Sequence, residues 1–458
     1  MNANLQQMLA GKQLLIDDLP YTTPEIQSHY ENGYITYRRG IDYLTNHKPT
    51  CVRCGNQEQH WFGSFPCSRC DETCLYCRKC LMMGRVSECT PLIGWKGPVP
   101  DWTVPARILE WQGTLSSGQL EASNRVKEAI QHHQELLVWA VCGAGKTEVL
   151  FAGIAAALAA RQRVCIATPR TDVVLELTPR LKAAFPHITV ASLYGGSDDR
   201  YLYAPLTIAT THQLLRFYQA FDTMILDEVD AFPYTVEESL QHAVGQARKP
   251  ISSMVYLTAT PNEKWQNECR TGKRAYVTIP ARFHRFPLPV PEYVWCGNWQ
   301  KQLEKNKLPS NVLQWASSRL GTGKQALLFF PHILYMEKAL AIFRRLSPKI
   351  EAVHAEDPDR KEKVQKMRNK QVPLLLTTTI LERGVTFPNI DVAVIGAEDD
   401  VFPESALVQI AGRAGRSRDF PDGVVTFFHY GKTKAMLKAK NQIISMNRES
   451  RNKGLIDR

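Results

Sequence analysis

The sequence predicts an α/β protein with two tandem parallel-sheet domains that follow a cysteine-rich module. Three observations support this: the length of the chain, two stretches in which strand-like and helix-like segments alternate, and cysteines gathered near the N-terminus. The chain has 458 residues, which exceeds one ordinary domain of about 100–200 residues. Strands that alternate with helices indicate a parallel sheet covered on both faces. We expect an N-terminal segment over 1–50, a cysteine module with its linker over 51–105, and α/β domains over 106–285 and 300–458.

The strand-like segments are short apolar runs that end in small or polar residues. In the first α/β domain they cover residues 136–140, 164–167, 206–209, 224–226 and 254–257. In the second they cover residues 326–330, 350–353, 372–376, 392–395 and 424–428. The clearest helix-like stretch, 149–161, is rich in Ala and Leu. Residues 281–305 contain three closely spaced prolines and are predicted to connect the two domains.

The first hundred residues are harder to assign. Residues 1–48 are polar, carry scattered tyrosines and predict short helices and loops, to which we assign no role. Residues 90–105 are rich in Pro and Gly and predict a linker or an irregular packed strap. The Lys/Arg-rich tail after Tyr430 is expected to be helical.

Charge and hydropathy limit the kinds of partner and the location that we expect for this chain. The formal net charge is +11 and the pI is about 9.0, which favours a polyanion, either nucleic acid or an acidic membrane surface, over the alternative of a merely basic enzyme. No apolar run reaches the roughly 18 residues that span a bilayer, and the N-terminus lacks the apolar segment of a signal peptide. We therefore expect a protein of the cytosol, or one bound to a membrane from outside.

A phosphate-binding loop is predicted after the first strand-like run. Gly143, Ala144 and Gly145 let the backbone turn so that its amides can face phosphate oxygens, and the following helix adds the partial positive charge of its N-terminus. Lys146 is expected to reach the terminal phosphates, and the Thr147 hydroxyl to bind magnesium.

Two adjacent carboxylates follow a later strand-like run. Asp227 stands at the end of the apolar run 221–226, where the strand end lies beside the phosphate loop in this architecture, and it is expected to hold Mg²⁺. Glu228 is expected to orient or deprotonate the attacking water. A solvated acidic turn is the alternative. The two motifs together predict binding and hydrolysis of a nucleoside triphosphate, with ATP and Mg²⁺ as cofactors.

Eight of the twelve cysteines lie between residues 51 and 89. In a reducing cytosol such cysteines are better explained by metal than by disulfides. Eight thiolates suit two closed tetrahedral zinc sites, with an iron–sulfur cluster or a redox switch as alternatives. The spacing leaves the pairing open. We favour one site of Cys51, Cys54, Cys77 and Cys80 and another of Cys67, Cys70, Cys74 and Cys89.

Basic and aromatic residues accompany these cysteines. They are Arg53, Arg69, Arg78, Lys79, Arg85, Trp61, Phe62 and Phe65. Such a surface can grip single-stranded DNA through phosphate contacts and stacking, and a solvated face is the equal alternative.

The order of motifs over residues 106–430 resembles that of superfamily 2 helicases and translocases, whose two domains are RecA-like. In that resemblance Gln119 belongs to the motif that reads adenine. Residues 166–170 and 210–214 resemble the loops that touch the nucleic-acid backbone, and 258–261 the motif that couples hydrolysis to domain movement. Residues 377–385 resemble a later motif. The resemblance implies DNA contacts by Arg170, Thr211, His212 and Thr378 and an ATP contact by Gly384.

The last motif covers residues 409–416 and holds two arginines. Arg413 and Arg416 are three apart, so we expect them on one face of a helix, facing the phosphates when the domains close. An arginine that stabilises the transition state contributes about 10³–10⁵ in rate. Arg416 is our first choice for that role and Arg413 the second, and a pair of surface arginines is the alternative.

The stretches 63–66 and 77–85, together with Asp227-Glu228-Val229-Asp230 and the three residues that follow, resemble the late-competence ComFA family of Gram-positive bacteria from Cys51 to the end of the chain. The resemblance implies a motor that drives transforming DNA as a single strand through a membrane channel. It also implies a cytoplasmic protein docked on the inner face of the membrane, near the channel proteins and ComFC.

Two other functions were considered. A replication-restart helicase of the PriA type also carries zinc, but its zinc module lies between the two motor halves, whereas here the cysteines precede both. A scaffold that uses zinc and nucleotide only for assembly would not need Arg413 and Arg416.

Overall fold

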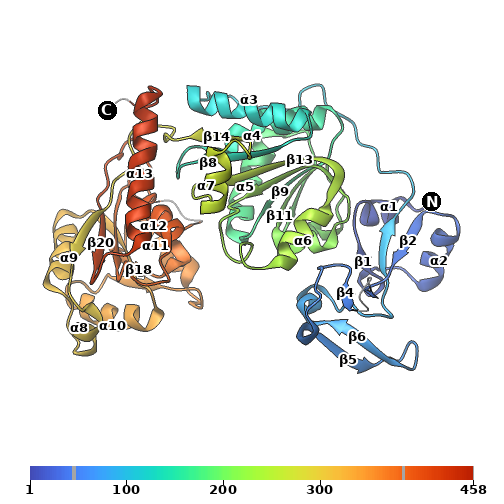
Figure 1. Cartoon of the computed structure of the whole chain (residues 1–458), viewed down its shortest axis with the longest axis horizontal. Coiled ribbons are helices and arrows are strands. Elements are labelled where there is room, and N and C mark those ends of the chain that lie inside the picture. Colours follow the sequence, from blue (N-terminus) through green and yellow to red (C-terminus); the bar gives the residue numbers. More distant parts are fainter. Residues whose placement is uncertain (44–47, 384–386, 457–458) are drawn as a thin grey trace.

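The fold is described from a computed structural model, which describes residues 1–43, 48–383 and 387–456. Three parts follow one another along the longest axis of the molecule (Figure 1). The N-terminal module lies at one end, the first α/β domain in the middle and the second α/β domain at the other end. The two expected parallel sheets are present.

The first α/β domain contains a seven-stranded sheet in the order β10-β11-β9-β12-β13-β8-β14, and every neighbouring pair is parallel. The strands are β8 (Glu135–Ala140), β9 (Val164–Thr168), β10 (Val190–Leu193), β11 (Leu206–Thr210), β12 (Phe221–Asp227), β13 (Arg248–Thr258) and β14 (Tyr276–Ile279). Its helices are α3 (Ser117–Gln131), α4 (Lys146–Ala159), α5 (Thr171–Ala184), α6 (Glu238–Ala247) and α7 (Glu263–Arg270). All residues of β9 and β11 are buried, which explains their continuous apolar runs.

The second α/β domain contains a six-stranded parallel sheet in the order β15-β20-β19-β16-β18-β17. The strands are β15 (Glu292–Trp295), β16 (Gln325–Phe329), β17 (Glu351–Val353), β18 (Leu374–Thr377), β19 (Ile390–Ile395) and β20 (Val425–His429). The helices are α8 (Trp299–Glu304), α9 (Ser310–Thr322), α10 (Ile333–Phe343), α11 (Arg360–Arg368), α12 (Glu404–Ala411) and α13 (Lys434–Asn452). The main hydrophobic core includes residues of both α/β domains, so their facing surfaces pack together.

The N-terminal module is more regular than the sequence predicts. Its three-stranded antiparallel sheet has the order β1-β7-β2, and β7 lies within the stretch that we expected to be an irregular strap. The strands and helices are α1 (Ala3–Leu9), β1 (Leu14–Leu15), α2 (Thr23–Glu31), β2 (Ile35–Arg38), β3 (Ile41–Tyr43), β4 (Pro49–Cys51), β5 (Phe62–Pro66), β6 (Thr73–Cys77) and β7 (Leu92–Trp95). The expected inter-domain connection, 281–305, likewise contains β15 and α8.

The N-terminal module and the first α/β domain share a core. Cys51, Cys54, Cys77 and Cys80 belong to the same buried cluster as Val229 and residues of α6. In the part of the chain that the structure describes, no helix is both long and apolar enough to cross a membrane.

Candidate nucleotide-hydrolysis site and cysteine clusters

The phosphate loop (residues 141–145) turns sharply between the end of β8 and the start of α4. Gly143 has φ +81° and Gly145 has φ +69°, both in the left-handed region that favours glycine. A Cβ added to Gly145 would also lie 2.4 Å from Nε2 of the Gln119 side chain. The loop therefore presents Lys146 and Thr147 as the first residues of α4, with the helix N-terminus directed at the cleft.

One cavity of about 560 Å³ brings the predicted ATP-site residues together from both α/β domains. Its lining includes Gln119, Gly143, Ala144, Gly145, Lys146, Thr147, Asp227, Glu228, Arg413 and Arg416. We call it the cleft cavity. Gly384, which we also expected to contact ATP, lies outside the described residues. Trp111 and Phe283 line the cleft cavity as well, and no motif in the sequence marks either residue.

Asp227 and Glu228 supply two adjacent carboxylates at the end of β12. The backbone amide of Glu228 donates to Asp227 Oδ1 at 2.8 Å, and Glu228 has a left-handed φ of +53°. Burial raises the pKa of Asp227, opposed first by the charge of Lys146, and burial raises the pKa of Glu228, opposed first by Arg383. The Thr147 hydroxyl and the Asp227 carboxylate are the hard oxygen ligands that Mg²⁺ prefers, so the residues of this cavity fit that ion.

Gln119 is held by protein groups on both sides of its amide. Its Oε1 accepts from the amide of Ser116 at 2.8 Å, which closes a capping box at the start of α3. Its Nε2 donates to the carbonyl of Ala144 at 2.9 Å. In this structure Gln119 links α3 to the phosphate loop through these hydrogen bonds. Its expected contact with adenine stays a prediction.

The two arginines of the last motif are not on a helix as expected, because α12 ends at Ala411, Arg413 lies in the turn that follows it and Arg416 comes directly after that turn. Arg413 Nε donates to the carbonyl of Glu382 at 2.8 Å, and Arg416 Nε donates to the carbonyl of Gly412 at 2.9 Å. Burial, followed by the neighbouring charge of Arg416, lowers the pKa of Arg413. We call residues 412–416 the arginine loop. It places two positively charged side chains in the lining of the cleft cavity, together with Lys146.

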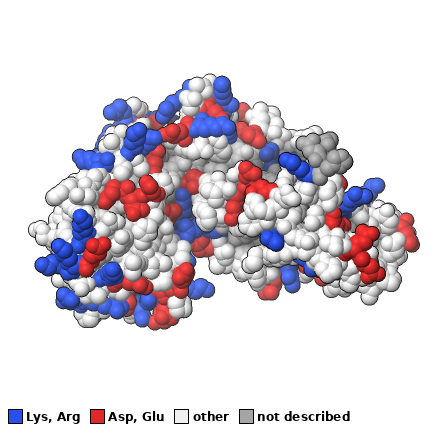
Figure 2. All heavy atoms as spheres, turned by 60° about the horizontal axis from the view of Figure 1, so that its bottom comes forward, with Lys and Arg blue, Asp and Glu red and all other residues white. Residues whose placement is uncertain are grey.

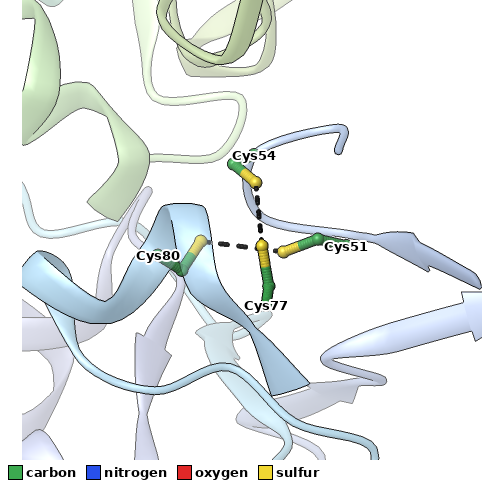
Figure 3. Close-up of side chains that lie close together, drawn as sticks. All are labelled: Cys51, Cys54, Cys77 and Cys80. Carbon is green, nitrogen blue, oxygen red and sulfur yellow. Dashed lines mark hydrogen bonds between the residues drawn. The ribbon is translucent and has the colours of Figure 1, made fainter. Parts of the chain in front are cut away.

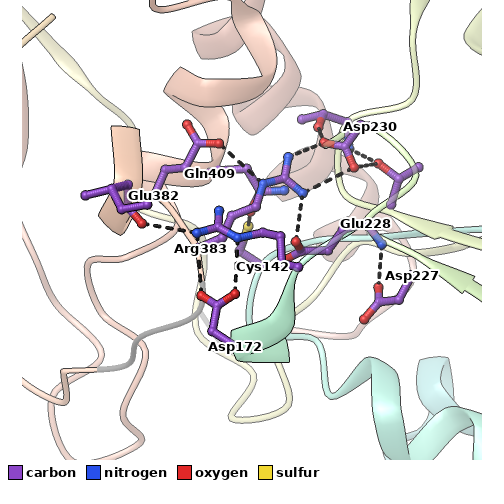
Figure 4. A network of polar contacts seen from close by, with 12 residues as sticks. Cys142, Asp172, Asp227, Glu228, Asp230, Glu382, Arg383 and Gln409 are labelled. Atoms are coloured by element: carbon purple, nitrogen blue, oxygen red, sulfur yellow. Dashed lines mark hydrogen bonds and ion pairs between the residues drawn. The ribbon is translucent and has the colours of Figure 1, made fainter. Parts of the chain in front are cut away.

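A polar network crosses between the α/β domains beside the cleft cavity (Figure 4). Arg383 donates to Asp230 Oδ2 at 2.5 Å and lies 3.6 Å from Glu228 Oε2. The hydroxyls of Thr258 and Thr260 donate to the same Asp230 carboxylate at 2.7 and 2.5 Å. We assigned no role to Arg383 or Asp230 from the sequence, although both stand inside motifs that we recognised.

The residues expected to touch nucleic acid differ in accessibility. Arg170 NH2 donates to the carbonyl of Ile380 at 3.2 Å, so this loop reaches the other α/β domain. His212 and Thr378 are partly exposed. Thr211 is fully buried, so its side chain does not present itself to a ligand in this structure.

The eight cysteines form two separate groups, with the pairing that we favoured. In the first group, the inner cluster, the Sγ atoms of Cys51 and Cys80 are 3.7 Å apart and those of Cys54 and Cys77 are 3.6 Å apart (Figure 3). Four thiolates about 2.3 Å from a tetrahedral zinc ion would lie about 3.8 Å from one another. The donor set and spacing of the inner cluster therefore fit zinc.

The buried side chain of Arg53 is hydrogen-bonded to the inner cluster and to the backbone beside it. It is 2% exposed, donates to Cys80 Sγ at 3.4 Å and also bonds the carbonyls of Cys80, Met83 and Gly84. Hydrogen bonds from neighbouring thiols, Cys51 first, lower the pKa of Cys80, and this favours the thiolate that a metal requires. Arg53 thus does not belong to the expected basic-aromatic surface.

The second group, the outer cluster, is Cys67, Cys70, Cys74 and Cys89. The Sγ atoms of the last three lie 3.0–3.4 Å from one another, and Cys70 is exposed. These separations are shorter than the roughly 3.8 Å of a tetrahedral zinc site, so for the outer cluster it is the set of four thiolates, and not the spacing, that fits zinc. On the same module, Lys79 lies over the ring of Trp61 and Arg85 over that of Phe65. Phe62 is buried and is not part of this surface.

Two RecA-like parallel-sheet domains that close on one phosphate cavity define an ATP-dependent helicase-type ATPase. Residues 118–268 match the DEAD/DEAH box helicase family, and residues 305–418 match the helicase conserved C-terminal domain. The fold is similar to that of a variant of S. cerevisiae Dbp5 bound to RNA and ADP BeF3, with a TM-score of 0.53, 14% identity, and coverage of 75% of this chain and 98% of that one. These domains imply ATP and Mg²⁺ as cofactors.

The particular family follows from the N-terminal module. Residues 1–94 match the competence protein ComFA N-terminal domain. The chain is 51% identical to competence protein ComFA of Bacillus subtilis (strain 168), over 97% of this chain and 95% of that protein. It is 39% identical to competence protein ComFA of Streptococcus pneumoniae (strain ATCC BAA-255 / R6), over 85% and 91%. The chain belongs to the ComFA family, whose helicase domains make it a DNA-binding ATPase of competence.

Proposed function

We propose that the chain is a single-stranded DNA translocase that uses ATP to drive transforming DNA across the cytoplasmic membrane during competence. The observation that supports this most directly is the cleft cavity, where Lys146 and the carboxylates of the first α/β domain face Arg413 and Arg416 of the second. A site completed only when two domains meet can link each hydrolysis event to a relative movement of the domains.

The charged residues and the phosphate-loop groups of the cleft cavity have proposed parts in hydrolysis. The phosphate-loop amides and Lys146 bind the phosphates, while Thr147 and Asp227 would hold Mg²⁺, which supplies charge neutralisation when it is bound. Glu228 orients the attacking water and accepts its proton. Arg416, followed by Arg413, stabilises the charge that develops on the transferred phosphoryl group.

DNA contacts are proposed on both α/β domains. Arg170 and His212 on the first domain and Thr378 on the second lie in the loops that match the nucleic-acid motifs. Basic side chains are visible in the hollow between the two domains (Figure 2), and the net charge of +11 favours a polyanion. Arg69, Arg78 and Arg85 are exposed and Lys79 is partly exposed over the ring of Trp61, and this face offers a second place where single-stranded DNA can stack and pair.

The remaining parts of the proposal concern metal and partners. The inner and outer clusters would each hold one zinc ion, which stabilises the part of the N-terminal module around it. Competence channel proteins and ComFC are proposed as partners on the inner face of the cytoplasmic membrane. Support for these partners comes from membership of the ComFA family alone.

The test is ATPase turnover with single-stranded DNA, duplex DNA and RNA, with Lys146→Ala as the inactive control. Single-stranded DNA should stimulate turnover most, and Lys146→Ala should abolish it while leaving the fold intact, because Lys146 faces the cavity rather than the core. Affinity for single-stranded DNA should fall with salt at a log–log slope near −0.7 for each phosphate contacted. An ATPase turnover that is the same with and without DNA would indicate an assembly scaffold instead.

A further inference from the structure

Three residues of the first α/β domain hold the arginine loop against the phosphate loop. They are Cys142, in the phosphate loop, and Arg282 and His284, just beyond β14. The arginine loop belongs to the second domain, about 130 residues further along the chain. No motif in the sequence marks Arg282 or His284, and neither lines the cleft cavity.

Arg282 makes two of these contacts. It is 1% exposed, its NH1 donates to the carbonyl of Gly415, and its NH2 donates to the carbonyl of Gly412 at 3.3 Å. The side chain also passes the phosphate loop, where a Cβ added to Gly143 would lie 3.7 Å from its Cγ. Arg282 therefore lies beside the phosphate loop and is hydrogen-bonded to the loop that carries the two arginines.

His284 and Cys142 reinforce the contact. His284 Nδ1 accepts from the amide of Phe286 at 3.3 Å, which leaves Nε2 to carry the proton that it donates to the carbonyl of Gly415 at 3.1 Å. Cys142 Sγ donates to Gln409 Oε1 at 2.9 Å, and a Cβ on Gly412 would lie 2.5 Å from the Cβ of Cys142. The backbones of the two loops thus approach as closely as glycine allows.

The positive charges at this contact favour the binding of an anion nearby. Arg282, Arg413 and Arg416 gather there, and the Nε of Arg282 is buried with no hydrogen-bond partner among the described residues. Burial, followed by the charge of Arg416, lowers the pKa of Arg282 to about 9. A triphosphate in the adjacent cleft cavity would offset this concentration of positive charge.

We propose that Arg282 is a positioning residue for ATP hydrolysis: by binding the carbonyls of Gly412 and Gly415, it sets the arginine loop so that Arg413 and Arg416 reach the terminal phosphate. It acts through those two arginines and does not touch the reacting atoms. The inference rests on the proposed ATP site, and it adds that the segment joining the two α/β domains takes part in the timing of hydrolysis.

The experiment compares Arg282→Met and Arg282→Lys with the wild type in the full chain. ADP lacks the terminal phosphate, whereas ADP with beryllium fluoride also fills the position of that phosphate. For Arg282→Met we expect kcat to fall about 10²-fold, since a displacement of about 1 Å at catalytic groups costs that much. The Kd for ADP should stay within about twofold of wild type, while the Kd for the beryllium fluoride complex rises at least tenfold. Arg282→Lys, which keeps one charged donor, should recover part of both losses.

The matched control is Arg163→Met. Arg163 is also a buried arginine of the first α/β domain that bonds backbone carbonyls, but those belong to Ala10 and Ala204, away from the cleft. This variant should keep the wild-type ratio of the two affinities. Equal loss of ADP and beryllium fluoride binding in Arg282→Met would make Arg282 a structural or phosphate-binding residue, and wild-type values of kcat and of both Kd would remove it from the mechanism. A wild type without DNA-stimulated turnover would count against the proposed function, and the affinity ratio would still decide the role of Arg282.

Discussion

The guanidinium of Arg383, on the second α/β domain, donates to the carboxylate of Asp230 on the first at 2.5 Å, and both side chains are almost completely buried. Asp230 also accepts from the hydroxyls of Thr258 and Thr260. The same guanidinium lies 3.6 Å from Glu228, the proposed water-orienting residue. The contact between the domains is thus connected directly to the carboxylates of the cleft cavity.

Arg383→Met should uncouple closure of the domains from hydrolysis. Removing one partner of a buried ion pair costs about 3–5 kcal/mol because the other charge is left unpaired, and here the cost falls on the closed arrangement. We expect DNA-stimulated turnover to fall sharply while the Kd for ADP is retained. Arg344→Met removes a more exposed pair with Glu351, worth about 0–1 kcal/mol, and is the control. Equal turnover in the two variants would contradict the coupling.

Glu228→Gln should stop hydrolysis after ATP has bound. An amide keeps the shape of the side chain but cannot take a proton, and general-base catalysis contributes about 10²–10⁴ in rate. We expect kcat to fall by that amount, with bound ATP and closed domains accumulating, as measured by single-turnover kinetics and small-angle scattering. Asp172→Asn, on a residue paired with Arg170 outside the cavity lining, is the control. Unchanged turnover in Glu228→Gln would show that another group orients the water.

The parts of the fold that the sequence predicted are those with a local cause. The strands β9, β11 and β19 are buried along their whole length, and their sequences are therefore mostly apolar. The edge strand β15 is only partly buried and follows three prolines, so its pattern resembles a linker. Strand β7 depends on β1, about eighty residues earlier, and no local pattern announces such a partner.

The same distinction applies to the candidate site, where some residues stand in local motifs and others are brought together only by the packing of the two domains. Lys146 and Asp227 were predictable because a phosphate loop and a carboxylate at a strand end are contiguous motifs with a fixed chemistry. The pair of Asp230 and Arg383 joins residues 153 apart, and only the packing of two domains brings them together. Arg282 stands in no motif, since its function comes from two backbone carbonyls that any sequence could supply.

The two cysteine clusters should differ in what they stabilise. The inner cluster shares a core with α6 and Val229 of the first α/β domain, whereas the outer cluster includes the exposed Cys70. Metal analysis should give two zinc ions per chain. Cys54→Ser should remove one zinc and lower the Tm of the first domain, and Cys70→Ser should remove one zinc with little change in that Tm. A single zinc in the wild type, or equal loss of Tm in both variants, would contradict this division.

Lys12 should make the stability of the N-terminal module depend on pH. It donates to the carbonyls of Arg200 and Leu202 at 3.0 and 3.3 Å, across the contact with the first α/β domain. Burial, followed by the charges of Arg163 and Arg216, lowers its pKa from 10.5 to about 7. Between these two values the unfolded chain binds more protons than the folded chain, so the free energy of unfolding should rise with pH, by at most about 1.4 kcal/mol per pH unit.

The measurement for Lys12 is chemical unfolding at pH 7, 8 and 9, followed by the fluorescence of the N-terminal tryptophans. The difference in stability between the wild type and Lys12→Met should move in favour of the wild type as the pH rises, because only the wild type sheds a buried charge on the way. Comparison with this variant cancels the titration of the cysteines, which is common to both proteins. Lys48→Met, on a residue outside this contact, should follow the wild type. Parallel pH profiles for the wild type and Lys12→Met would show that Lys12 stays charged in the folded chain, with Asp18 and Asp222 near the neighbouring arginines as the groups that offset it.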